Sequence, residues 1–224
     1  MDSGRSSGPV ARGRARLGRE IGAKVTVWLG LAVGICVPYF GLQRVHLFPL
    51  RSVPATPLDA LVAFDPAWVW AYASLALLVP LGPLLATRRE ELVRYAIGLA
   101  WLCAACFVVF LFFPVEGPRP ATLPDDPLYR FVVSQDRPSN SLPSLHAGLT
   151  LYSFLFCWRV FGAGLAPRRR AAFVAFAGLW GAAILYATLA TKQHWALDLP
   201  AGMALALGAH AWAWRESAAR GARR

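Results

Sequence analysis

Residues 95–115 read YAIGLAWLCAACFVVFLFFPV, and this stretch decides what kind of fold the chain adopts. It contains no charged side chain, and apolar residues occupy every face of the helix that it would form. A helix needs about 20 such residues to cross the ~30 Å hydrocarbon core of a bilayer. Because lipid offers no hydrogen-bond partner to the backbone, we expect this stretch to be a transmembrane helix.

The same pattern recurs along the whole 224-residue chain, in which 57% of the residues are hydrophobic and only 16% are charged. Soluble domains typically contain about 45–50% apolar and about 25% charged residues, so a water-soluble fold is disfavoured. The charge-free stretches are 25–43, 66–87, 95–115, 138–158, 171–191 and 199–214. We therefore predict an all-α integral membrane six-helix bundle. The expected spans are about 25–42, 66–86, 93–114, 143–164, 171–190 and 195–214.

Composition divides the chain into three parts. Residues 1–23 are rich in Gly, Ser and Arg, which predicts a disordered basic cytoplasmic tail. Residues 24–214 hold the six expected spans, and residues 215–224 form a second basic cytoplasmic tail. The two long loops, 42–65 and 115–142, fall on the same side of the expected bundle.

The net charge of +11 would suit a nucleic-acid binder, but the distribution of the charge argues against one. Of 23 Lys and Arg residues, sixteen lie in four segments that alternate with loops carrying only six. This alternation is the positive-inside pattern of membrane proteins. We predict a cell-membrane protein with both termini in the cytoplasm, whose basic segments meet anionic headgroups rather than nucleic acid.

The four cysteines all fall inside apolar spans, where no disulfide framework is expected. Cys103 and Cys106 are three positions apart on one helix, but no further Cys or His lies at ligand spacing nearby. We therefore expect them to pack helices, and we predict neither a metal site nor a cofactor.

Three ionisable residues lie where a membrane helix would be expected to have none, namely His146, His194 and Asp198. Such residues are costly at membrane depth and are functional candidates by default. His146 lies just inside the start of the fourth span, and His194 and Asp198 are four apart at the start of the sixth. A helix would place the latter two on one face. Both helix starts are expected at the external surface, so the three side chains should share one outward-facing pocket.

That combination suits chemistry on a phosphate ester. A carboxylate bonded to one imidazole nitrogen orients the other as a nucleophile, and a second histidine can protonate a leaving alkoxide. Arg119, in Gly-Pro-Arg-Pro on the same side, offers a planar fork for phosphate oxygens. Helix starts add N–H groups that favour an anion.

Three motifs carry a resemblance to a known family: GPRP at 117–120, PSLHA at 143–147 and HWALDLPAG at 194–202. They resemble the type-2 phosphatidic acid phosphatase superfamily of membrane enzymes. The resemblance implies that His194 forms a phosphohistidine, Asp198 orients it, and His146 is the general acid. It also implies that Arg119 binds the phosphate and that Ser144 lies beside it.

The chain departs from the family pattern at four positions. Phe112 stands where the family has a Lys, Ala187 and Thr188 replace a Ser-Arg pair, and Leu145 replaces a Gly. Two phosphate-binding cations are therefore missing, and Lys192, two residues before His194, is the best-placed substitute. The Ser-Leu-His form resembles the branch that contains inositol phosphorylceramide synthases and sphingomyelin synthases.

We accordingly expect a membrane enzyme that cleaves a lipid phosphoester at the external leaflet through a phosphohistidine. Its substrate would be a phospholipid, or a sphingolipid or isoprenoid phosphate. Water as acceptor would make it a lipid phosphatase, and a lipid hydroxyl would make it a phosphotransferase. The alternative is a transporter or flippase that binds an anionic lipid without reacting. The lipid, the acceptor and the oligomeric state are left open.

The predicted orientation is testable by cysteine labelling. Because loop 115–142 is expected outside, Asp126→Cys should react with a membrane-impermeant thiol reagent on intact cells. Arg169→Cys, in a basic segment, should react only after permeabilisation. Labelling of Arg169→Cys but not Asp126→Cys on intact cells would reverse the topology and move the site to the cytoplasm.

Overall fold

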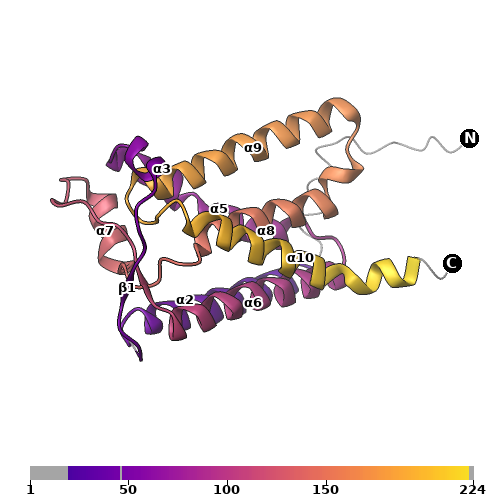
Figure 1. Cartoon of the computed structure of the whole chain (residues 1–224). Helices are drawn as coiled ribbons and strands as arrows, with labels where there is room; N and C mark the ends of the chain where they lie inside the picture. Colours follow the sequence, from indigo (N-terminus) through magenta and orange to yellow (C-terminus); the bar gives the residue numbers. More distant parts are fainter. Residues whose placement is uncertain (1–19, 46, 222–224) are drawn as a thin grey trace, which may run out of the picture.

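The chain folds into a bundle of long helices with short elements gathered at one end (Figure 1). The computed structural model describes residues 20–45 and 47–221. Helix accounts for 72% of the structure and strand for 3%, which confirms the expectation of a mainly helical chain. Residues 1–19 and 222–224, which include most of the predicted N-terminal tail, lie outside the described residues.

Four helical segments are long and apolar enough to cross a bilayer, and they match four of the expected spans. They are α2 (Ile21–Leu42), the segment Pro66–Leu85, α6 (Arg89–Phe112) and α9 (Pro167–Ala190). The segment Pro66–Leu85 consists of the 3-10 turn η1 (Pro66–Trp68), α4 (Val69–Ala73) and α5 (Leu75–Leu85). Large apolar side chains on these helices point outward: Val37 is 67% and Leu179 is 75% exposed. Such surfaces suit contact with lipid rather than water.

The other two expected spans form helices with different limits. Helix α8 (Leu145–Val160) has 16 residues, about 24 Å at 1.5 Å per residue, and the 3-10 turn η2 (Gly162–Gly164) follows it. Helix α10 (Asp198–Gly221) begins later than predicted, because residues 194–197 form a turn. It also extends beyond residue 214, into the range predicted as a tail. A bundle of six membrane spans therefore stays a prediction.

The buried core surrounds α8, which packs against α5, α6, α9 and α10. Tyr152 and Phe156 of α8 are fully buried beside Leu99 of α6. Glycine permits the closest approach, because a Cβ at Gly202 of α10 would overlap the carbonyl oxygen of Ser144. This close contact joins the start of α8 to the first turn of α10.

Polar loops and short elements lie together at one end of the bundle (Figure 1). Strand β1 (Arg51–Ser52) pairs in parallel with β2 (Val115–Glu116), and Val115 also bridges to Asn140. Helices α3 (Pro57–Leu61) and α7 (Pro127–Gln135) complete this end. The carboxylate of Asp126 caps α7 by accepting a hydrogen bond from the Tyr129 N–H at 2.7 Å.

Basic residues lie at the opposite end of the bundle. Lys24 Nζ donates to the Leu84 carbonyl at 2.8 Å, and Arg94 Nη1 donates to the Ala213 carbonyl at 2.7 Å. These bonds bring together the start of α2, the end of α5, the start of α6 and the end of α10. The predicted alternation of charge requires this arrangement, and which side of the membrane it faces stays a prediction.

Candidate active site

Two connecting segments meet at the polar end of the bundle: the segment before α8 and the turn between α9 and α10. Ser144 N–H donates to the Asp198 carbonyl at 2.9 Å, which fixes the start of α8 against the start of α10. Ser144 also caps α8, since its hydroxyl accepts from the Ala147 N–H at 3.2 Å. The described contacts of Ser144 are thus structural. Its predicted place beside the phosphate stays a prediction.

His194 is held by the end of α9 rather than by a helix of its own. The N–H groups of Gln193 and His194 both donate to the Thr188 carbonyl, at 3.0 and 3.2 Å. Lys192 makes this turn with a φ of 53°, in the left-handed region. The expectation that His194 and Asp198 share a helical face was therefore wrong, because His194 precedes α10.

The two side chains nevertheless meet. His194 Nδ1 lies 3.0 Å from the Ser141 carbonyl oxygen and 3.4 Å from Asp198 Oδ2. A carbonyl oxygen only accepts hydrogen bonds, so Nδ1 carries the hydrogen in this arrangement. The lone pair of the neutral ring is then on Nε2. His194 is only 3% exposed and Asp198 is fully buried, which limits competition from bulk water for these bonds.

Asp198 is itself held in place by neighbouring donors. Its Oδ2 accepts from the Ser141 hydroxyl and from the Trp195 N–H, the latter at 2.8 Å. Ser141 therefore contacts both members of the pair, through its carbonyl and through its hydroxyl. Ser141 was not among the residues predicted from the sequence. Its position beside the PSLHA motif was the available signal.

His146 lies opposite, with its ring centre 5.7 Å from that of His194. It is the second residue of α8 and stacks on Tyr72 of α4 at 4.1 Å between ring centres. Tyr72 Oη is 3.4 Å from His146 Nδ1 and donates to Asp136 Oδ2 at 2.7 Å. Each histidine thus has a carboxylate associated with it, directly for His194 and through Tyr72 for His146.

Asp136, at the end of α7, was also not among the residues predicted from the sequence. Its Oδ1 accepts from Tyr39 Oη at 2.7 Å and from Gln43 Nε2 at 2.6 Å. Burial alone would raise the pKa of this carboxyl, but the charge of His146, the hydroxyls of Tyr72 and Tyr39 and the charge of Arg119 together hold the pKa below its usual value. The sequence offered little signal, because Asp136 lies in a polar loop between the GPRP and PSLHA motifs and belongs to neither.

Arg119 lies close to this network but binds backbone carbonyls. Its Nη1 donates to Pro118 and Lys192 at 2.9 and 3.1 Å, and its Nη2 donates to Asp136 at 2.7 Å. The guanidinium therefore joins three segments around the two histidines. Five N–H donors are available on an arginine, so this use leaves some for an anion.

Lys192 points away from the histidines, toward the first long loop. Its Nζ donates to the Asp59 and Val62 carbonyls at 3.3 and 2.5 Å. Asp59 in turn accepts from the Ala196 N–H through Oδ1 at 2.8 Å. The described contacts of Lys192 are thus to α3 and the loop that follows it. Its predicted role as a substitute cation stays a prediction.

The residues that stand in place of the two missing cations, Phe112 and Thr188, make other contacts. Phe112 is 56% exposed and lies beside Phe48, and Thr188 is buried, with its hydroxyl donating to the Leu185 carbonyl at 2.7 Å. Ala187 and Leu145 are buried. Within residues 20–45 and 47–221, no group of three or more His, Cys, Asp and Glu side chains is arranged to hold a metal ion.

Comparison with protein-family models gives a match to the PAP2 superfamily over residues 43–212. This range includes both histidines, Asp198 and Asp136, whereas Tyr39 lies just before it. Searches of curated proteins and of solved structures found no match.

The three carbonyl contacts of Arg119 predict a specific loss of stability. In Arg119→Lys the charge is kept, but an ammonium group cannot bridge carbonyls on three segments. Loss of such bonds should lower the free energy of unfolding by about 1–3 kcal/mol, measured by thermal unfolding of the detergent-solubilised protein.

Arg130→Lys is the matched control for Arg119→Lys. Arg130 also binds a backbone carbonyl, that of Pro124, but its side chain is 55% exposed in its ion pair with Asp125. Its replacement should change stability little. Equal unfolding temperatures for the two variants would show that Arg119 does not hold these segments together.

Proposed function

Because the chain belongs to the PAP2 superfamily, which supports a phosphatase-like lipid phosphoesterase, we propose that it cleaves a lipid phosphoester through a phosphohistidine at His194. The observation that carries the proposal is the contact of His194 Nδ1 with the Ser141 carbonyl and Asp198. It leaves Nε2 as the nitrogen with a free lone pair. A nucleophile that is held by a second group and opposed by an acid is the usual arrangement for covalent catalysis.

In the first step, the Nε2 lone pair attacks phosphorus and an N–P bond forms. The bond between phosphorus and the lipid oxygen breaks, and His146 donates a proton to the departing alkoxide. Nδ1 keeps its hydrogen, so the phosphorylated ring is cationic and is stabilised by the Asp198 carboxylate. The 5.7 Å between the ring centres supports contact of both imidazoles with a single phosphoryl group.

In the second step, His146 has lost its proton and acts as a base. It removes a proton from an acceptor hydroxyl, whose oxygen attacks phosphorus while the N–P bond breaks. Water would give free phosphate, and a lipid hydroxyl would give a new phosphoester. The burial of His194 favours an acceptor that arrives through the membrane, since a site that excludes water suppresses hydrolysis.

The negative charge of the phosphate would be met mainly by N–H groups. The Leu145 and His146 N–H groups at the start of α8 have no partner among the described residues. A helix start favours an anion through these groups and through its dipole. Arg119 also has N–H donors to spare, and Phe112 and Thr188 offer no charge. This supports a substrate that carries less charge than a phosphate monoester, such as a diester.

The site lies at the end of the bundle that bears α3 and α7, opposite the basic end. With the positive-inside orientation, this arrangement supports action at the external leaflet. Asp136 and Tyr72 would hold the His146 ring in position for proton transfer.

The experiment that tests this proposal compares leaving groups. His194→Ala should abolish cleavage of both an alkyl and an aryl phosphoester. His146→Ala should slow cleavage of the alkyl ester by about 10²–10⁴-fold but spare the first, phenol-releasing step with the aryl ester, which is measured as the initial burst of phenol, because a phenolate leaves without a proton. Tyr72→Phe should resemble His146→Ala in a milder form. Adding a lipid alcohol to the assay identifies the acceptor from the products.

Tyr186→Phe is the matched control for Tyr72→Phe, because Tyr186 is 41% exposed on α9 and packs against Trp68. It should leave both rates unchanged. Normal turnover in His194→Ala would contradict the proposed nucleophile. Lipid binding without turnover in the wild-type protein would favour a transporter instead.

A further inference from the structure

A groove runs between α2 and the facing segments α4 and α5. Its outer section is a cavity of about 440 Å³, which is a size typical of ligand sites. Leu31, Ala32 and Ile35 line it from α2, and Ala73 and Ala76 line it from the other side. The lining is almost entirely apolar, so it suits hydrocarbon rather than a headgroup.

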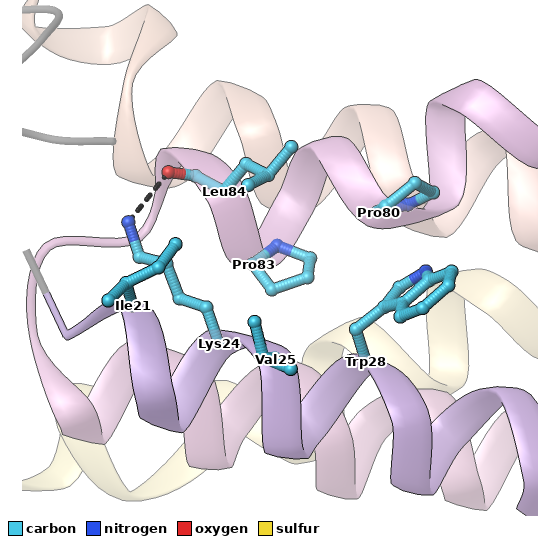
Figure 2. A pocket seen from close by; sticks show the side chains of 7 residues that line it. All are labelled: Ile21, Lys24, Val25, Trp28, Pro80, Pro83 and Leu84. Carbon is cyan, nitrogen blue, oxygen red and sulfur yellow. Dashed lines mark hydrogen bonds between the residues drawn. The ribbon is translucent and has the colours of Figure 1, made fainter. Parts of the chain in front are cut away.

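The inner section continues the groove toward the basic end of the bundle. Figure 2 shows this second cavity, of about 190 Å³, between Val25 and Trp28 of α2 and Pro80 and Pro83 of α5. Trp28, Pro80 and Pro83 line both cavities. The two cavities are therefore consecutive sections of one groove.

Small and rigid side chains keep the two helices from closing on each other. Pro80 and Pro83 lie one turn apart on α5 and place compact rings where longer side chains would fill the space. Ala76 is one turn before Pro80, and Ala32 lies on the facing stripe of α2. The groove is thus built from residues spaced three or four apart on both helices.

The two ends of the groove differ in chemistry. His146 and Tyr72, which belong to the candidate active site, line its outer end. Lys24 lines its inner end, where Nζ binds the Leu84 carbonyl at 2.8 Å (Figure 2). A chain attached to a phosphate at the histidines can enter the outer end directly.

The length of the groove selects the kind of chain. From Lys24 to Phe40 along α2 it covers roughly 24 Å at 1.5 Å per residue, whereas one leaflet contributes about half of the ~30 Å hydrocarbon core. An acyl chain confined to the outer leaflet would leave the inner section empty. A longer chain that crosses the midplane would fill both sections.

We propose that this groove binds the hydrocarbon chain of the substrate, and that the substrate has one long chain of the polyprenyl class. The proposal rests on the proposed function, because it assumes that the phosphate lies at His146 and His194. It adds the lipid class, which the histidines alone do not specify. The inner section holds only about 190 Å³, and so small a volume favours one chain over the two of a diacylglycerol.

Substitutions that block the groove test the proposal. Ala76→Trp should lower kcat/KM at least about tenfold for a long-chain polyprenyl phosphoester, because the indole fills the path of the chain. Turnover of the matching dimethylallyl phosphoester, whose chain is too short to extend past Ala76, one turn beyond Tyr72, should stay within about twofold. Leu77→Trp is the control, since Leu77 neighbours Ala76 but is 70% exposed and does not line the groove.

Ala32→Trp and Val33→Trp form a second pair on α2, because Val33 is 62% exposed and lies outside the groove. The proposal is overturned if the blocked variants and their controls turn over the long-chain substrate equally. It is also overturned if the wild-type protein prefers a diacylglycerol-based phosphoester over the polyprenyl one.

A binding measurement separates failure of this proposal from failure of the proposed function. A polyprenyl phosphate with a photoreactive group at the far end of its chain should label residues 21–28 or 80–84 of the full-length protein, whether or not it is turned over. Labelling confined to the exposed face of α9, around Val174 and Leu179, would contradict the groove. So would crosslinks to a second copy of the protein at these residues.

Discussion

The candidate active site depends on one contact, in which Ser141 meets His194 and Asp198. The carbonyl of Ser141 fixes the hydrogen on His194 Nδ1, and its hydroxyl holds the Asp198 carboxylate. Without this contact, the segment before α8 would have no polar connection to the imidazole, and His194 could rotate within its turn. The close approach at Gly202 makes the contact possible, because it lets the starts of α8 and α10 touch.

Around this contact, charged side chains serve to assemble loops. Arg119 joins three segments and Lys192 joins the turn before His194 to the first long loop. In a chain with few charges, each of these residues satisfies backbone carbonyls that lipid could not satisfy. The absence of cations at positions 112 and 188 fits the same pattern, in which the few charged side chains near the site bind backbone carbonyls. It also supports a substrate whose phosphate is held mainly by N–H groups and whose affinity comes largely from its hydrocarbon chain.

Much of this architecture was predictable from sequence, because apolar stretches and charge alternation report directly on membrane helices. The pairing of His194 with Asp198 was predicted for the wrong reason: a spacing of four suits a helix face, and here the turn at residues 194–197, closed by the hydrogen bond from the Asp198 N–H to the Trp195 carbonyl, produces the same proximity. The association of Asp136 and Tyr72 with His146 was not predictable, since it depends on how α7 folds back over α4. The carbonyl contacts of Arg119 were missed because a motif identifies a cation but not its partners.

The most direct test of the account is identification of the covalent intermediate. Wild-type protein mixed with a radiolabelled lipid phosphoester and quenched in base, where phosphohistidine survives, should carry label on the peptide that contains His194. His146→Ala should accumulate the adduct from an aryl ester, because the acceptor then lacks its base. Label on another residue, or turnover without any adduct on His194, would contradict the proposed role of His194.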